Sequence, residues 1–193
     1  GQRCSALRVL CLQDDVADHT LKMLRGAMAE CRMGNPGRLT TDIGPVIDAE
    51  AKANIENHIQ TMRTKGRPVF QAVRENSEDA REWQTGTFVP PTLIELASFD
   101  ELKKEVFGPV LHVVRYNRNE LDKLVEQINA SGYGLTLGVH TRIDETIAQV
   151  TGSAKVGNLY VNRNMVGAVV GVQPFGGEGL SGTGPKAGGP LYL

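Results

Sequence analysis

This sequence of 193 residues has few cysteines and few aromatic residues, and its net charge is only −1. The three cysteines, Cys4, Cys11 and Cys31, are odd in number and lack any C-x-x-C spacing, which argues for a reducing compartment and against a disulfide framework or zinc site. The 21 Lys and Arg residues nearly balance 22 Asp and Glu residues, so no nucleic-acid or membrane surface is indicated. No apolar run approaches the roughly 20 residues of a membrane span. The four histidines are scattered, so we predict no metal site.

The length fits one ordinary domain with a sizeable core, and the sequence shows no internal repeat and no clear domain boundary. No secretory signal opens it. Because it begins with Gly1 rather than Met, inside what looks like a motif, we expect a fragment whose residues 1–193 form one domain.

Hydrophobic periodicity predicts strands alternating with helices along most of the chain. The predicted strands cover residues 7–12, 69–73, 110–116, 135–140 and 158–162. The predicted helices cover residues 14–32, a segment capped by Asp48 and ended at Gly66, a segment capped by Asn119, and a segment lined by Ile143, Ile147 and Val150. Short connections between such elements imply an α/β fold, with a three-layer parallel sheet and flanking helices.

Three segments do not fit this alternation. Residues 74–86 are polar and are predicted to be a solvated loop, while Pro90-Pro91 confine residues 88–96 to a sheet edge or irregular structure. Residues 163–189 form a long glycine-rich loop after a strand ending at Asn162, and long loops of this kind are usually functional or disordered. Gly177-Glu178-Gly179-Leu180-Ser181-Gly182 matches G-x-G-x-x-G, but no strand precedes it and no helix can follow, so we predict close backbone packing rather than a dinucleotide site.

The first residues, Gly1-Gln2-Arg3-Cys4, place a thiol between a polar entry and an apolar run. Only the thiolate is a nucleophile, and Arg3 together with backbone N–H groups at a turn would favour the anion. The alternative is a small buried residue at the start of a strand. Cys11 and Cys31 fall in apolar patterns, so we expect both to belong to the core.

The run Glu105-Val106-Phe107-Gly108-Pro109 precedes a predicted strand. A carboxylate there could accept hydrogen bonds from sugar hydroxyls, and the phenyl ring could pack on a flat ring. Taken alone, this run favours a surface Glu beside a core Phe over a cofactor contact.

Taken together, these motifs resemble the NAD(P)-dependent aldehyde dehydrogenase superfamily. The resemblance rests on Gly1-Gln2-Arg3-Cys4, Glu105-Val106-Phe107-Gly108-Pro109 and Pro174-Phe175-Gly176-Gly177 in this order and at these separations. Residues 4–6, 162–168, 172–175 and 186–190 are similar to the L-glutamate γ-semialdehyde dehydrogenase branch, and more narrowly to the C-terminal half of bacterial bifunctional proline-utilisation flavoenzymes.

The resemblance implies a catalytic domain that oxidises L-glutamate γ-semialdehyde with NAD. Cys4 would be the nucleophile, forming a thiohemiacetal and then a thioester. Glu105 would bind the nicotinamide ribose and Phe107 would pack beside it. Ser5 would hold the substrate α-carboxylate together with the backbone N–H groups of Gly167 and Ala168. Phe175 would pack on the aliphatic chain of the substrate.

The resemblance also implies what else the parent protein contains. Its general-base Glu, oxyanion Asn and nucleotide-binding domain would precede Gly1, and its oligomerisation strand would follow Leu193. We therefore expect a homo-oligomeric, cytoplasmic bacterial parent, with a peripheral position at the inner membrane left open as an alternative. FAD is expected only in a separate proline dehydrogenase domain, if the parent is bifunctional. An aldehyde is the expected small-molecule partner, and the isolated chain is expected to lack turnover.

Two other hypotheses come from different classes of protein. One is a cysteine acyl-transfer enzyme in which a histidine activates Cys4. The other is a non-catalytic α/β binding module in which Cys4 is a core residue.

Overall fold

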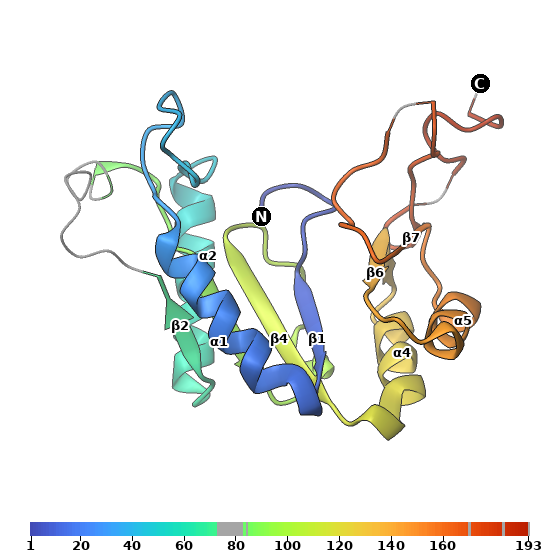
Figure 1. The fold of residues 1–193 in the computed structure, drawn as a ribbon. Coiled ribbons are helices and arrows are strands. Elements are labelled where there is room, and N and C mark those ends of the chain that lie inside the picture. The colour runs from blue at the N-terminus through green and yellow to red at the C-terminus, as the bar shows by residue number, and fades with distance from the viewer. Residues whose placement is uncertain (73–82, 84, 170, 183, 193) are drawn as a thin grey trace. The chain divides into compact units, whose positions relative to one another are not determined.

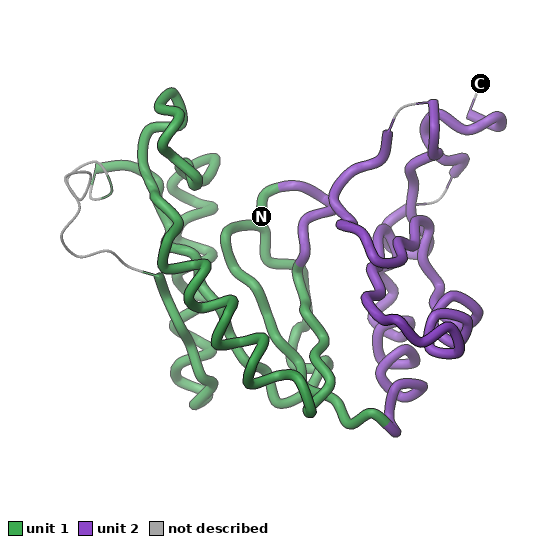
Figure 2. Tube along the Cα trace, viewed as in Figure 1, with its two compact units in different colours: residues 1–2, 8–118 green, residues 3–7, 119–193 purple. Residues whose placement is uncertain are grey.

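The computed structural model describes residues 1–72, 83, 85–169, 171–182 and 184–192. They form two compact units, coloured separately in Figure 2. Unit 1 contains residues 1–2 and 8–118, and unit 2 contains residues 3–7 and 119–193. None of the helices in the described part of the chain is long and apolar enough to cross a membrane.

Unit 1 is built on a four-stranded sheet in the order β1-β4-β3-β2 (Figure 1). The strands are β1 (Val9–Gln13), β2 (Val69–Gln71), β3 (Thr92–Leu96) and β4 (Val110–Tyr116). β4 pairs in parallel with both β1 and β3, whereas β2 pairs antiparallel with β3. Within its described residues, the helices of this unit include α1 (Asp14–Glu30) and α2 (Ala49–Thr64), and a 3-10 turn lies at Phe99–Glu101.

The two helices of unit 1 cover opposite faces of this sheet. Successive strand residues point to opposite faces, so Leu93 and Val113 pack with α1 while Ile94 and Val114 pack with α2. All four side chains are almost fully buried. The three layers confirm the predicted α/β class, although the sheet is mixed because its outer strand β2 runs antiparallel.

The part of unit 2 that the structure describes contains two helices and two short sheets. The helices are α4 (Leu121–Ala130), which follows a 3-10 turn at Arg118–Glu120, and α5 (Asp144–Ser153). β6 (Thr136–Val139) pairs in parallel with β7 (Asn158–Val161), and α5 connects them as the strand–helix–strand pattern predicts. β5 (Tyr133–Gly134) pairs antiparallel with β8 (Glu178–Gly179).

Most predicted elements are present, with boundaries shifted by a few residues. Asp48 caps α2, its side chain accepting a hydrogen bond from the Ala51 N–H at 2.7 Å. The expectation for residues 88–96 was wrong in one respect: β3 begins just after Pro90-Pro91 and lies inside the sheet, because neither proline occupies a ladder position. In the helix after β4, Glu120 rather than Asn119 occupies the N-cap position, and the Glu120 side chain makes no capping hydrogen bond. The predicted loop at 74–86 lies largely outside the described residues.

The glycine-rich segment packs its backbone closely, as predicted for the G-x-G-x-x-G match. A Cβ atom added at Gly177 would lie 2.6 Å from the carbonyl oxygen of Ser181. One added at Gly179 would lie 2.5 Å from the carbonyl oxygen of Gly132, and Gly179 has a φ of 59°, which favours glycine. These contacts explain the glycines without a bound dinucleotide.

Candidate active site

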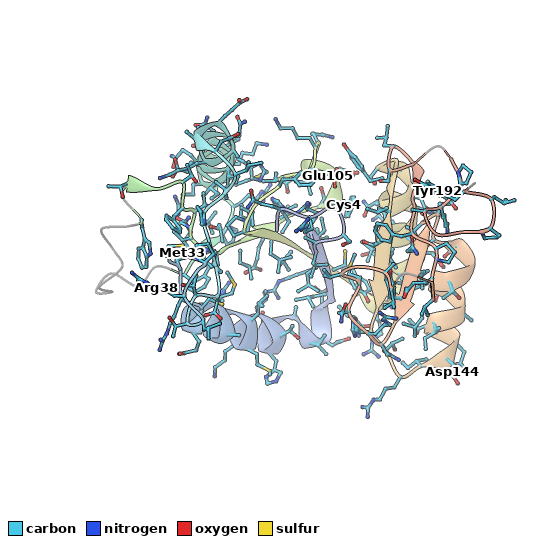
Figure 3. All side chains as sticks on the ribbon, turned by 90° about the horizontal axis from the view of Figure 1, so that it is seen from above. Cys4, Met33, Arg38, Glu105, Asp144 and Tyr192 are labelled. Atoms are coloured by element: carbon cyan, nitrogen blue, oxygen red, sulfur yellow. The ribbon has the colours of Figure 1, made fainter. Side chains whose placement is uncertain are left out.

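Cys4 and Ser5 occupy the two central positions of a tight turn in unit 2. The turn is closed by a hydrogen bond from the Ala6 N–H to the Arg3 carbonyl oxygen at 3.1 Å. Cys4, labelled in Figure 3, is exposed, whereas Ser5 is buried at 5% exposure. The thiol is therefore accessible to a small electrophile. The binding-module hypothesis required Cys4 to be a core residue, and its exposure contradicts that requirement.

The turn is joined to the glycine-rich loop by one long-range hydrogen bond. The Gly167 N–H donates to Ser5 Oγ at 3.2 Å, across 162 positions of sequence. Gly167 has a φ of 81°, a conformation that favours glycine. Because Ser5 Oγ accepts from Gly167, the hydroxyl hydrogen of Ser5 can still be donated to a ligand. Two of the predicted carboxylate-binding residues thus meet directly beside Cys4, and Ala168 follows them half-buried.

A buried tyrosine holds the backbone of this loop at Gly167. Tyr160 on β7 is 4% exposed, and its hydroxyl donates to the Gly167 carbonyl oxygen at 3.3 Å. Gln173 Nε2 donates in turn to the Tyr160 hydroxyl at 3.4 Å. From the sequence, Tyr160 is predicted only as a strand residue. One feature of the sequence could have indicated this role: Tyr160, with a polar hydroxyl on an apolar ring, stands just before the glycine-rich loop.

A buried asparagine fixes the segment around Phe175. Asn158, also on β7, donates from Nδ2 to the Pro174 carbonyl oxygen at 2.8 Å and accepts from the Gly176 N–H at 3.1 Å. Phe175 itself exchanges two backbone hydrogen bonds of 2.9 Å with Ala187. The half-buried phenyl ring of Phe175 is therefore held by both of its neighbours and by its own backbone. The sequence contained no local sign of the role of Asn158.

The predicted cofactor-contacting residues lie in unit 1 beside an arginine. The side chain of Glu105, labelled in Figure 3, is 35% exposed, and Phe107 is 45% exposed. Arg8 Nε lies 4.0 Å from Glu105 Oε1, and its guanidinium carbon lies 4.0 Å from the centroid of the Phe107 ring. Partly exposed carboxylate oxygens and an exposed ring suit the hydroxyls and flat ring of a nicotinamide riboside.

The predicted site residues therefore fall into two groups. Unit 2 contains the predicted nucleophile and the residues predicted to contact the substrate, and unit 1 contains Glu105 and Phe107. Within unit 2 the structure brings Ser5 and Gly167 into contact. Within unit 1 it places Glu105 and Phe107 around Arg8, which was not among the predicted site residues.

Two of the four histidines bond to each other inside unit 1. His58 Nε2 and His112 Nε2 lie 2.8 Å apart, and His112 is 1% exposed. Burial, and then His58, lower the pKa of His112 to about 4, and burial also lowers the pKa of His58. The acyl-transfer hypothesis needs a histidine free to take a proton from Cys4, and these two are committed to one another.

The remaining cysteines differ from Cys4 in their surroundings. Burial raises the pKa of Cys11 to about 12, which keeps it a neutral thiol, as expected for a core residue. Cys31 follows the last residue of α1 and is half-buried, its thiol lying 3.7 Å from the Ala27 carbonyl oxygen. Cys31 therefore lies beyond the end of the helix and not on its buried face, where it was expected.

No group of three or more possible metal ligands occurs among the residues that the structure describes.

A sequence model of the aldehyde dehydrogenase family matches residues 1–193, so the chain belongs to this family. Within the family it is 93% identical, over its whole length, to the bifunctional protein PutA of Klebsiella aerogenes, of which it covers 15%. It is 35% identical over its whole length to a 1-pyrroline-5-carboxylate dehydrogenase of Bacillus cereus, of which it covers 36%.

A solved structure of another PutA protein has a similar fold. A crystal structure of a mutant of Bradyrhizobium japonicum proline utilization A (PutA) matches with a TM-score of 0.90 and 51% identity, covering 99% of this chain and 19% of that one. The chain thus spans between about a seventh and about a third of the length of the relatives described here.

Proposed function

We propose that residues 1–193 form the catalytic domain of an NAD-dependent dehydrogenase that oxidises L-glutamate γ-semialdehyde to L-glutamate, the second step of proline catabolism. The observation that carries the proposal is the turn in unit 2. It exposes the Cys4 thiol and holds Ser5 beside it on the Gly167 N–H at 3.2 Å. A nucleophile and a donor for a carboxylate then lie on consecutive residues. The 35% identity to a 1-pyrroline-5-carboxylate dehydrogenase of Bacillus cereus, and the similarity to proline utilization A of Bradyrhizobium japonicum, support this chemistry.

In the proposed reaction Cys4 attacks as the thiolate. A bond forms between Sγ and the aldehyde carbon, and the electrons of the C=O π bond move to oxygen. The Cys4 backbone N–H would be one donor to that oxygen, a type of contact worth about 2.7–4 kcal/mol in other enzymes. NAD, when bound, supplies the acceptor for the hydride that leaves this carbon. The thioester on Cys4 is then cleaved by water: a C–O bond forms, the C–S bond breaks, and the carboxylate, the Cys4 thiol and one proton are released.

The residues of this chain suit both the substrate and the cofactor of the proposed reaction. Ser5 would donate its hydroxyl hydrogen to the substrate α-carboxylate, and Ala168 would add a backbone N–H. The Gly167 N–H would orient Ser5 and share the carboxylate only by shifting its present hydrogen bond. Phe175, fixed by its neighbours, would pack on the aliphatic chain of the substrate. Glu105 and Phe107 would hold the nicotinamide riboside of NAD, as their exposure allows.

We infer that the rest of the machinery belongs to a longer chain. The general base, the oxyanion Asn and the nucleotide-binding domain would precede these residues, and FAD would be confined to a separate proline dehydrogenase domain in a bifunctional parent. A homo-oligomeric parent and a cytoplasmic location belong to the same proposal. The thiol content of the sequence supports a reducing compartment.

The proposal is tested in a full-length protein. Residues 1–193 are placed in the matching position of Klebsiella aerogenes PutA, to which they align over 193 residues. We call this protein the grafted enzyme. With glutamate semialdehyde and NAD it is expected to form NADH, measured by absorbance, and Cys4→Ala is expected to abolish that signal. Cys31→Ala is the matched control and is expected to retain it. Turnover that persists in Cys4→Ala would contradict the proposal.

A further inference from the structure

Arg8 lies at the point where several groups of unit 1 meet, although it is not one of the predicted cofactor contacts. Its side chain is only 11% exposed. Its guanidinium carbon lies 4.0 Å from the centroid of the Phe107 ring, and its Nε lies 4.0 Å from Glu105 Oε1. Its Nη1 donates to the Gly1 carbonyl oxygen. One cation therefore contacts the ring, the carboxylate and the backbone that borders them.

The Gly1 carbonyl oxygen links Arg8 to the far end of the same segment. It also accepts a hydrogen bond from the Gly108 N–H at 3.1 Å. The guanidinium thus packs on Phe107 and forms an ion pair with Glu105 without a hydrogen bond from Nε, and Gly108 is held by a carbonyl that Arg8 itself contacts. Moving the guanidinium would release several of these constraints together.

The backbone of Arg8 is anchored independently of its side chain. The Arg8 carbonyl oxygen accepts from the His112 N–H at 3.0 Å, and His112 Nδ1 lies 3.2 Å from it. Because a carbonyl only accepts, His112 Nδ1 carries the hydrogen, and His112 Nε2 in the neutral ring is then the acceptor for His58 Nε2–H. The buried histidine pair therefore fixes the point from which the Arg8 side chain extends.

We propose that Arg8 is a positioning residue for the cofactor-contacting segment 105–108. It occupies one face of the Phe107 ring and draws Glu105 toward it, so that the remaining face and the other carboxylate oxygen are held ready for a nicotinamide riboside. The proposal rests on the proposed function, because it assumes that this segment contacts NAD. A guanidinium suits this place, since its flat fork can lie on a ring while its N–H groups reach separate oxygens.

A merely structural arginine would have a different signature. Its loss would weaken unit 1 as a whole and would not separate cofactor binding from substrate binding. A positioning residue changes the affinity for NAD while the KM for the aldehyde is unchanged. It also changes the order of segment 105–108 in the absence of any cofactor.

The test uses the grafted enzyme and three variants. Arg8→Met removes the cation and keeps an apolar side chain, whereas Arg8→Lys keeps the charge without the fork. Arg115→Met is the matched control: Arg115, on β4 of the same sheet, pairs with Glu95 at 3.2 Å and Asp18 at 2.7 Å. NAD affinity is measured by calorimetry. Backbone hydrogen exchange of residues 105–108 is measured without NAD, and the KM for glutamate semialdehyde by NADH formation.

Arg8→Met is expected to weaken NAD binding about ten-fold, the usual scale for a partly buried cation on an aromatic ring. Exchange at Gly108 should accelerate, Arg8→Lys should fall between, and the KM for the aldehyde should stay within about two-fold. Arg115→Met should match the unsubstituted protein. If Arg8→Met does not fold, Arg8→Lys carries the same comparison. Unchanged NAD affinity and unchanged exchange in the Arg8 variants would overturn the proposal while leaving the dehydrogenase activity intact. An unsubstituted grafted enzyme that does not bind NAD would instead contradict the proposed function.

Discussion

Lowering the pH from about 7.5 to about 5 should destabilise unit 1 by about 2 kcal/mol through the buried His58–His112 pair. In the folded chain, burial and then His58 lower the pKa of His112 to about 4, whereas in the unfolded chain the imidazole returns to its ordinary pKa near 6.5. Between these values the unfolded chain binds more protons, so stability is present above about pH 6.5 and is lost as the pH falls toward 4.

The size of the effect follows from the two pKa values. At about pH 5 the unfolded imidazole is almost fully protonated and the folded one is about one-tenth protonated, which gives the figure of about 2 kcal/mol. The positive charges near the pair act in the same direction: Arg8 lowers the pKa of His112, and Lys65 and Lys104 lower that of His58. The hydrogen bond to the Arg8 backbone acts against them, because it raises the pKa of His112. The lowered pKa values of Asp15 and Glu101 affect stability only at lower pH, where carboxylates take up protons.

The chain carries its own probe for this measurement. Trp83 is the single tryptophan of the sequence and belongs to unit 1, where its Nε1 donates to the Met33 carbonyl oxygen at 3.1 Å. Its fluorescence can follow urea unfolding at each pH, and a loss of about 2 kcal/mol lowers the urea midpoint by roughly 1 M.

Two variants separate the pair from other titrating groups. His112→Asn can still donate to the Arg8 carbonyl oxygen but does not titrate, so most of the pH dependence of the midpoint should disappear, leaving the smaller effect of His58, whose own pKa is lowered by burial. His19→Gln, which replaces an exposed histidine on α1, should keep the full dependence. A midpoint that does not move in the unsubstituted chain, or a pH dependence that is undiminished in His112→Asn, would refute this account.

Three further outcomes are expected. Limiting iodoacetamide should label Cys4 before Cys11 and Cys31, because Cys4 is exposed and burial raises the pKa of Cys11 to about 12; peptide mapping by mass would show a different order if Cys4 were unreactive. In the grafted enzyme Gly167→Val should lower kcat/KM for glutamate semialdehyde about ten- to a hundred-fold, but much less for an alkyl aldehyde. The cause is backbone strain at a φ of 81° rather than crowding, since an added Cβ would meet nothing within 4 Å, and equal losses for both aldehydes would contradict it. The isolated chain should fold at least partly but show no NADH formation, and steady turnover would show that these residues contain a complete cofactor site.

Local patterns account for most of the secondary structure. The period of apolar residues placed α1, α2, β4 and β7 within a few residues of their observed bounds. Asp48 as a helix cap follows from side-chain chemistry that acts within one turn. The strand β3 was misjudged because Pro90-Pro91 were assigned to it, while only the sheet shows that the ladder begins at Thr92.

The assignment of individual strands to sheets could not be read from periodicity. β4 and β6 both look like strands of one parallel sheet, yet β4 pairs with β1 and β3 while β6 pairs with β7. Periodicity reports which face of a strand is buried, and it contains no information about which strand lies alongside.

By itself, the sequence determined the class of fold, the family resemblance and the residues of the candidate site, because these depend on residue type, spacing and order. Only the tertiary structure decided that Ser5 meets Gly167, that Asn158 holds the backbone around Phe175, and that Arg8 joins Glu105 to Phe107. Each of these contacts joins residues far apart in the chain. Whether such groups meet depends on how helices, strands and loops pack together. Local sequence preferences do not determine that packing.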